Sequence, residues 1–228
     1  MPASDTARAV LEHCLDAFAR CGEVGSHLLA PREVLAQSGL LSHHPLIQQI
    51  GGYGLDDPGT SDHHILATRS PLTGRVLFLS HDGATRFIFD SGSRFLEAVR
   101  EAHQRGIEVT DLHPEHLPLA EDLAALGALV RSLLEVQELH DVVVSVIPSL
   151  NLEDIDLLRR LAQEEDIFLG EAVGIAIERR PLPAPLPIAG LCAADGHPQV
   201  AWASARAVRR IRQLGQLTAF KAPRRAGR

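Results

Sequence analysis

The sequence predicts an α+β fold, in which helices pack on a small antiparallel sheet and a second α+β unit follows. Short β-type runs alternate with amphipathic helical patterns along the chain. Hydrophobic residues make up 45% and charged residues 22% of the 228 residues, proportions that are usual for globular proteins. That length is sufficient for two domains of ordinary size, each with its own core.

Helical patterns open the first half of the chain. Apolar residues between Asp5 and Cys21 recur every three or four positions, which predicts an amphipathic helix. Pro31 suits the first turn of a shorter helix that ends at Gly39. The stretch 42–62 is rich in Gly, Pro, Asp and His, so we expect an irregular loop there.

Three antiparallel strands are expected after this loop. The runs 64–68, 75–80 and 85–89 are rich in β-branched and aromatic residues. A Pro- and Gly-containing turn joins the first two, and the pair Asp82-Gly83 favours a tight hairpin between the second and the third. Capping side chains at 90–93 then predict an amphipathic helix that ends at Gly106.

The second half alternates between the two patterns. We expect strands at 142–147, 167–177 and 188–193, and helices at 123–134, 152–162 and 204–214. A connection with two prolines after Gly106 separates the halves. The expected domains are therefore 1–106 and 107–217, followed by a disordered basic tail over 218–228.

Composition limits the location and the chemistry that we expect. The N-terminus has no secretory pattern and no apolar run is long enough to span a bilayer, so we expect a cytoplasmic protein without a membrane partner. Cys14, Cys21 and Cys192 are an odd number without CxxC spacing, which argues against a disulfide framework or structural zinc. We expect Cys14 and Cys21 to be packed in the core, and no cofactor.

Charge is unevenly distributed along the sequence. The formal net charge is −7, yet no carboxylate follows Arg206, and the chain ends with several arginines. Such a tail is the one part that we expect to be able to touch nucleic acid. Elsewhere the expected partner is a protein.

Histidines and acids offer the candidates for catalysis. His63 and His64 are adjacent in a predicted strand and should point to opposite faces, so they should not bind one metal ion together. Ser80-His81-Asp82 is a contiguous run, whereas the members of a catalytic triad converge from separate segments. We expect no catalytic residue and no metal site. A small metal-dependent hydrolase or nucleotide-binding enzyme that uses His63, His81 and Asp82 remains the alternative.

Several segments resemble the SUKH superfamily, which is named for bacterial proteins related to yeast regulators of cell-wall synthesis. The segments are 28–35, 74–79, 81–83 and 90–99, and the resemblance covers Leu28 to Gly106. It implies a helix before a sheet, a serine-capped helix after it, and a role in binding proteins. Many members of the superfamily are immunity proteins that neutralise bacterial toxins.

The sequence therefore favours a non-catalytic protein-binding module, either an immunity protein that binds a cognate toxin or a regulatory scaffold. Acidic loops beside arginine-lined strands can steer a charged partner. The residues expected to bind are Tyr53, Asp56, Asp57, Arg69, Arg75 and Arg86. A structural or secretion-associated component is the further alternative.

Overall fold

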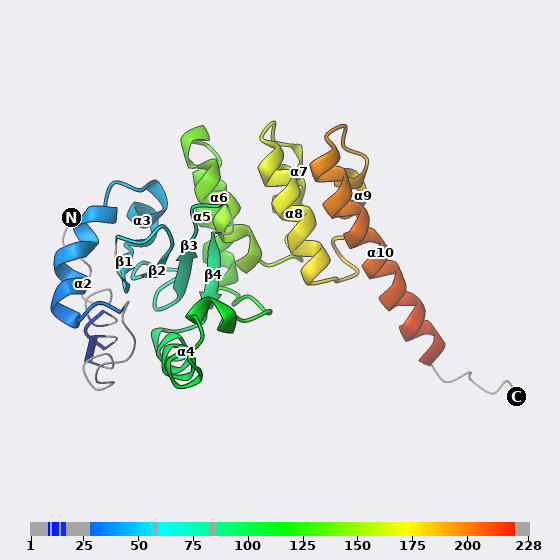
Figure 1. Ribbon diagram of the computed structural model, residues 1–228. Coiled ribbons are helices and arrows are strands. Elements are labelled where there is room, and N and C mark those ends of the chain that lie inside the picture. The colour runs from blue at the N-terminus through cyan, green and yellow to red at the C-terminus, as the bar shows by residue number, and fades with distance from the viewer. Residues whose placement is uncertain are drawn as a thin grey trace, which may run out of the picture. The chain divides into compact units, whose positions relative to one another are not determined.

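The computed structural model describes residues 9, 11–13, 15–16, 28–56, 59–82 and 85–221 (Figure 1). The fold class is α+β, as predicted, with a four-stranded antiparallel sheet and many helices. The chain divides into two compact units, Met1–Leu150 and Asn151–Arg228. This division differs from the expected one after Gly106, because helices that follow Gly106 pack with the first sheet.

The sheet consists of consecutive strands in the order β1-β2-β3-β4, each antiparallel to the next. Their bounds are β1 Tyr53–Gly54, β2 His63–Leu66, β3 Val76–Leu79 and β4 Arg86–Phe89. The three strands expected from the sequence are confirmed in place. Strand β1 was missed, because two residues are too few to give an alternating pattern.

Both faces of the sheet are buried. Ile65, Leu77 and Phe87 lie opposite one another in register and are fully buried. On the other face, Phe78 and its neighbours form a core cluster with the helix α4, Gly92–Arg105. A sheet that is covered on both faces explains why apolar residues run continuously along the strands instead of alternating with polar ones.

Helix α4 has the termini that the sequence predicts. The hydroxyl of Ser91 accepts a hydrogen bond from the amide of Arg94 at 3.3 Å, which satisfies one of the free donors of the first turn. Gly106 ends the helix with a φ of 64°, a left-handed conformation that suits glycine.

The expected loop at 42–62 contains a helix as well as β1. Helix α3, Pro45–Ile50, is capped by His44 and ends at Gly51, whose φ is 60°. The prediction failed because this helix is a short segment, and the Gly and Pro residues that suggested a loop form its two ends. The other elements of the first unit are α2 Pro31–Gln37, η1 Ser38–Leu41, η2 Val109–Leu112, α5 Leu123–Leu133, η3 Gln137–Leu139, α6 His140–Val146 and η4 Ile147–Ser149.

All three strands expected in the second half are wrong. The segments 142–147, 167–177 and 188–193 are helical, and they lie in α6 with η4, in α8 Ile167–Arg179 and in α9 Leu186–Ala193. Each is rich in Val, Ile or Leu and substantially buried, so the polar face that marks an amphipathic helix is reduced. Short apolar runs of this kind do not distinguish a strand from a buried helix.

In the part that the structure describes, the second unit consists of helices and the turns that connect them. Helices α7 Ile155–Gln163 and α10 Pro198–Lys221 overlap the two helices expected there. Helices α8 and α10 run parallel and in contact, since Gly170 faces Val200 and Gly174 faces Ser204. Because glycine has no side chain, the backbones of these two helices can approach each other closely.

Two sets of sequence predictions fall largely outside the described residues. They concern most of the N-terminal helix with Cys14 and Cys21, and the end of the basic tail. Of that helix, Leu11 and Leu15 are described, and both are buried. None of the described helices is long and apolar enough to cross a membrane.

Candidate functional site

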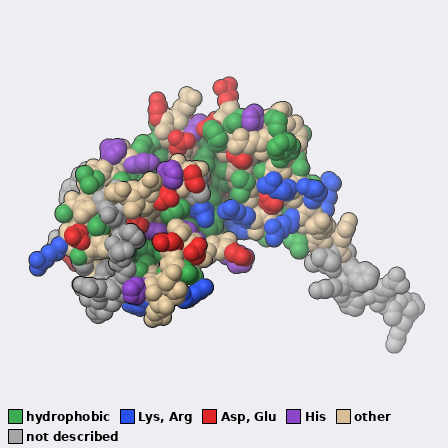
Figure 2. Space-filling model, viewed as in Figure 1, with side chains coloured by type: hydrophobic (Ala, Val, Ile, Leu, Met, Phe, Trp, Pro, Cys, Tyr) green, Lys and Arg blue, Asp and Glu red, His purple; other side chains and the backbone are tan. Residues whose placement is uncertain are grey.

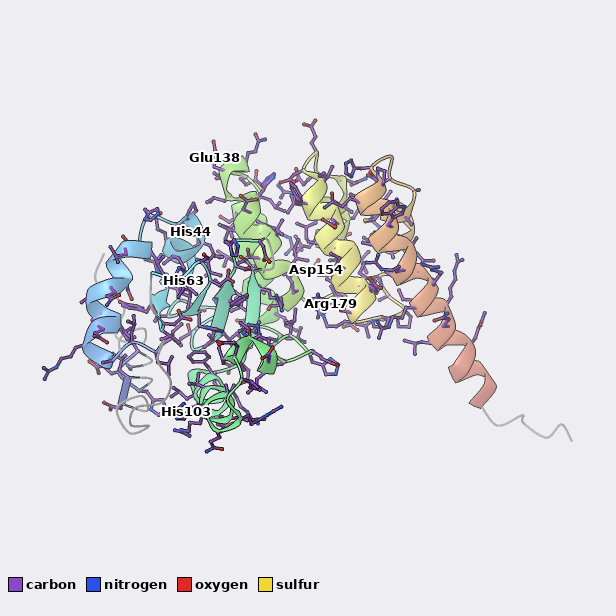
Figure 3. The ribbon with its side chains drawn as sticks, in the orientation of Figure 1. His44, His63, His103, Glu138, Asp154 and Arg179 are labelled. Carbon is purple, nitrogen blue, oxygen red and sulfur yellow. The ribbon has the colours of Figure 1, made fainter. Side chains whose placement is uncertain are left out.

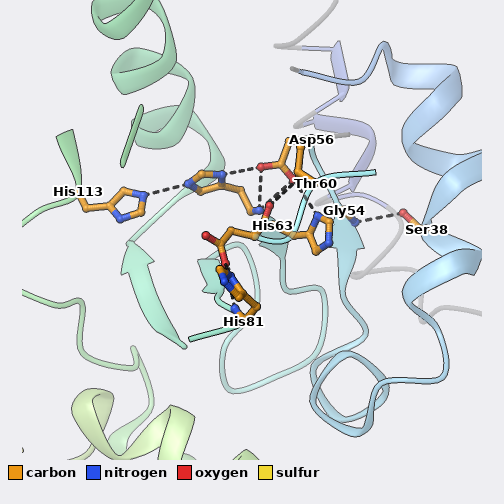
Figure 4. Close-up of polar contacts among 9 residues, drawn as sticks. Ser38, Gly54, Asp56, Thr60, His63, His81 and His113 are labelled. Carbon is orange, nitrogen blue, oxygen red and sulfur yellow. Dashed lines mark hydrogen bonds and ion pairs between the residues drawn. The ribbon is translucent and has the colours of Figure 1, made fainter. Parts of the chain in front are cut away.

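Three side chains of the first unit, one of them distant in sequence from the other two, form a hydrogen-bonded chain beside the sheet (Figure 4). His64 Nδ1 lies 2.7 Å from Oδ2 of Asp56, and His64 Nε2 lies 3.0 Å from Nε2 of His113. We call Asp56, His64 and His113 the buried relay. A carboxylate bonded to an imidazole is an arrangement that enzymes use to orient a base and that metal sites use to orient a ligand.

Local backbone structure fixes the position of Asp56. The residue follows β1 and pairs with Leu28, while the amide of Leu55 donates to the carbonyl of His64 at 2.8 Å. The amide of His64 then donates to both carboxylate oxygens of Asp56 at 3.0 Å. The Asp56 side chain therefore takes the place of the backbone acceptor that a longer β1 would supply.

Aromatic rings surround the histidines of the relay. The ring centroid of His64 lies 5.3 Å from that of Phe78 and 4.8 Å from that of Phe95. The His113 ring contacts Phe78 at 4.7 Å and Phe89 at 6.0 Å. Burial in this apolar environment, together with the charges of His64 and Arg86, lowers the pKa of His113 to about 4.

Hydrogen-bond chemistry fixes one proton of the relay. A carboxylate accepts, so Nδ1–H of His64 donates to Asp56. The other hydrogen bond joins the Nε2 atoms of His64 and His113, and either ring can supply its proton. Both ring nitrogens of His64 are occupied, and its side chain is only 5% exposed, so no group remains there to take a proton from a substrate.

His63 lies next to the relay without joining it through a hydrogen bond. It precedes His64 in β2 and, as predicted for neighbours in a strand, belongs to the opposite face. Its Nδ1 is buried and 3.8 Å from Oδ1 of Asp56. Among the residues that the structure describes, no group of three or more His, Cys, Asp or Glu could hold a metal ion.

His81 and Asp82 lie in an exposed turn after β3. Asp62 accepts hydrogen bonds from the His81 ring and from its amide, both at 2.9 Å. The bond to the ring raises the pKa of His81 and lowers the pKa of Asp62. In the described part of the chain, no hydrogen bond or ion pair joins His63 to His81 or Asp82.

Charged residues expected to bind a partner include two whose side chains point inward. Asp56 belongs to the relay and its side chain is 13% exposed, whereas Arg75 is 9% exposed and donates from Nε to the carbonyl of Leu119 at 3.0 Å. Arg86 is half-buried, while Arg69 donates to the carbonyl of Gln48.

The two remaining residues of that expected set differ in what the structure describes. Tyr53 is half-buried against the core cluster, and Asp57 lies outside the described residues. Of the described members of the set, Asp56 and Arg75 are turned inward, Tyr53 and Arg86 are half-buried, and Arg69 is exposed.

An open groove of about 620 Å³ runs along α4 in the same unit. We call it the α4 groove. Its apolar lining comes from β4, α4, the end of η2 and the segment after η2, and its polar lining combines carboxylates with Arg94 and His116. The lining residues are Ile88, Phe89, Asp90, Arg94, Glu97, Ala98, Glu101, Leu112, Pro114, His116, Pro118 and Leu119.

The buried relay anchors one wall of the α4 groove. Leu112 and Pro114 line the groove on either side of His113, which holds this segment against the sheet. The contact from Arg75 to the Leu119 carbonyl holds the far end of the same wall. Figure 3 labels two further histidines of this unit, His103 on α4 and His63 on β2, which lie apart from each other.

Sequence reasoning missed His113 and the groove. His113 is 49 residues from His64, and no local pattern links the two positions. The prolines around His113 indicated a connecting segment, which is correct for the backbone but says nothing about the wall that it forms.

No protein-family model matches the sequence, and comparison with curated proteins and with solved structures gives no match either.

Proposed function

We propose that this chain is a non-catalytic protein-binding protein whose α4 groove receives a segment of a partner protein. One observation carries the proposal: Asp56, His64 and His113 are engaged with one another in the interior of the unit, while the groove beside them is open. Its volume, about 620 Å³, falls in the range typical of binding pockets.

The lining of the groove indicates the class of segment that it would bind. Leu112 and Leu119 offer apolar contacts, and Ile88 and Phe89 line the groove while being at most 5% exposed, so the segment should carry an apolar anchor. Among the lining residues that carry a full charge, three are carboxylates and one is an arginine, Arg94. The excess of negative charge means that a lysine or arginine should flank that anchor.

The charged side chains that line the groove can give up their present ion pairs and form new ones with a ligand. Glu97 is paired with Arg94 at 2.9 Å, and Glu101 with Arg105 at 2.6 Å, and all four side chains are more than half exposed. Exposed ion pairs of this kind contribute at most about 1 kcal/mol. Breaking them on binding therefore costs little.

The resemblance to the SUKH superfamily supports a narrower form of the proposal. It covers α2, the sheet and α4, and α4 with β4 contributes half of the groove lining. In this form the chain is a cytoplasmic immunity protein or regulatory scaffold, and the segment in the groove belongs to a cognate toxin or another regulated protein.

Selection from a displayed peptide library, with the purified full-length chain as target, tests the proposal. Enriched peptides should share an apolar anchor beside a basic residue. The variant Ala98→Trp should fill the groove and weaken binding at least tenfold in fluorescence anisotropy, a loss of about 1.4 kcal/mol. Ala128→Trp, on the exposed surface of α5, is the matched control and should bind like the unmodified chain. Enriched peptides that bind both variants equally would refute a groove-based function.

A second candidate function, a hydrolase with acid–base or metal chemistry, is favoured by the 2.7 Å contact between Asp56 and His64. In that case the purified protein should contain stoichiometric zinc or manganese, or cleave a chromogenic ester at a rate that His64→Gln abolishes. A metal-free protein whose ester cleavage is unchanged by His64→Gln would eliminate this candidate.

A further inference from the structure

Helix α10 in the second unit presents a tryptophan to solvent. Trp202 is 71% exposed, although tryptophan is usually mostly buried. The side of the helix that packs inward is formed by Val200, Ala203, Ala207 and Ile211. At 100° per residue, Trp202 lies on the side opposite to these residues, so it takes no part in the core of the unit.

Arginines follow Trp202 at helical spacing. Arg206 is four residues further along and Arg209 seven, which puts all three side chains on one face of α10. Arg206 Nε contacts both carboxylate oxygens of Glu178 on α8, at 2.9 and 3.0 Å, and is thereby held beside Trp202. We call Trp202, Arg206 and Arg209 the Trp–Arg face.

The charge of this face is positive along the rest of the described helix. No carboxylate occurs in the sequence after Asp195, and the exposed Arg210 and Arg212 flank the face. Figure 2 shows Lys and Arg side chains gathered over the helices of the second unit. Glu178 neutralises one of these charges, so the face keeps an excess of arginine.

We propose that the Trp–Arg face docks an acidic segment of a partner protein. Tryptophan and arginine are the residues that most often dominate binding at protein interfaces, because they combine a large apolar area with hydrogen bonds. The guanidinium of Arg209 can bind a carboxylate through two parallel hydrogen bonds, and Trp202 can cover an apolar side chain next to it. This surface is separate from the α4 groove and requires nothing of it.

The same features favour a protein over a nucleic acid as the occupant. Single-stranded nucleic acid is bound through several aromatic side chains on which successive bases stack, whereas this face has one tryptophan. An acidic protein segment needs only one apolar residue to cover Trp202 and a carboxylate to pair with Arg209.

Trp202 is the sole tryptophan of the chain and therefore reports binding at this face directly. The full-length protein is titrated with a helical peptide of alternating Glu and Leu stripes, with its Lys counterpart, and with single-stranded oligothymidine. We expect the acidic peptide to shift Trp202 emission to shorter wavelength, saturably, and to bind less tightly as salt is added. The other two probes should bind at least tenfold more weakly.

Reversing one charge on α10 distinguishes docking at the Trp–Arg face from non-specific electrostatic attraction. Arg209→Glu should weaken the acidic peptide about tenfold or more, whereas Arg179→Glu, on the exposed end of α8, should not change its affinity. Circular dichroism spectra that match those of the unmodified chain establish that both variants are folded. The proposal is overturned by equal effects of the two variants, by tighter binding of oligothymidine, or by no emission shift at millimolar peptide.

Discussion

The protonation of His113 links the pH of the solution to the stability of the segment that forms one wall of the α4 groove. The imidazole ring is half-buried among phenyl rings and holds the segment after η2 to the sheet through His64. Because burial and neighbouring charge lower its pKa to about 4, it stays neutral in the folded protein at pH values where an unfolded chain binds a proton.

Acidification should therefore destabilise the first unit. Between pH 6.5 and pH 4 the unfolded state binds more protons at this residue than the folded state, so the free energy of unfolding falls as the pH falls. The full linkage is about 1.4 kcal/mol per pH unit, and the partial exposure of His113 reduces it.

Urea unfolding at several pH values measures this slope. The variant His113→Gln should be less stable near neutral pH and should lose stability less steeply on acidification than the unmodified chain. His103→Gln, at an exposed position on α4, is the matched control and should keep the original slope. A slope unaffected by His113→Gln would show that another group is responsible.

Sequence reasoning at the scale of single residues found polar positions but not their partners. It identified His63, His64, Asp56 and Arg75, and it expected the last two on a binding face. Their burial follows from contacts with His64, His113 and Leu119, up to 49 residues away, and no local spacing encodes such contacts.

At the scale of secondary-structure elements, the close contact between helices α8 and α10 depends on Gly174, which has no side chain. A Cβ added at Gly174 would overlap the Ser204 hydroxyl and lie 3.2 Å from the Ser204 backbone nitrogen. A backbone atom cannot move aside as a flexible side chain can, so the two helices would have to separate.

Gly174→Ala should therefore lower the free energy of unfolding of the second unit by about 1–3 kcal/mol, despite the better helix propensity of alanine. Gly190→Ala is the matched control, because nothing lies within 4 Å of the added Cβ in α9 and the residue is exposed. It should stabilise the unit by about 1 kcal/mol or less. Thermal unfolding followed by circular dichroism distinguishes the two, and a stabilising Gly174→Ala would contradict the close contact.

Elements with a polar face were predictable, and buried ones were not. Helix α4 was located from its spacing and its caps, and the strands β2, β3 and β4 from their composition and turns. Helices α6, α8 and α9 were mistaken for strands, because burial had replaced most of their polar face with Val, Ile and Leu. The amino-acid composition of these segments indicated that they are buried, but it did not indicate whether they are helices or strands.

On the scale of the whole molecule, the two units have separate cores. The sheet and its helices bury one set of apolar side chains, and α7 to α10 bury another that includes Leu161, Val173 and Ala207. Compact units with their own cores can fold as independent cooperative blocks.

A destabilising change in one unit should therefore remain within it. In hydrogen exchange resolved by peptide, Gly174→Ala should accelerate exchange over 151–221 and leave 28–150 unchanged, and His113→Gln should do the reverse. The combined variant should show the two effects added, within about 0.5 kcal/mol. Acceleration across the whole chain in either single variant would mean that the units unfold together.

The carboxylate of Asp56 has a consequence for how this sheet can be recognised. Strands at the edge of a sheet usually invite an extended peptide to add one more strand through backbone hydrogen bonds. At the β1 edge, Leu29 already donates its amide to the carbonyl of Leu55, and Asp56 occupies the amide of His64. Strand addition at this point is blocked by the chain itself, which also protects the β1 edge from pairing with another molecule into aggregates.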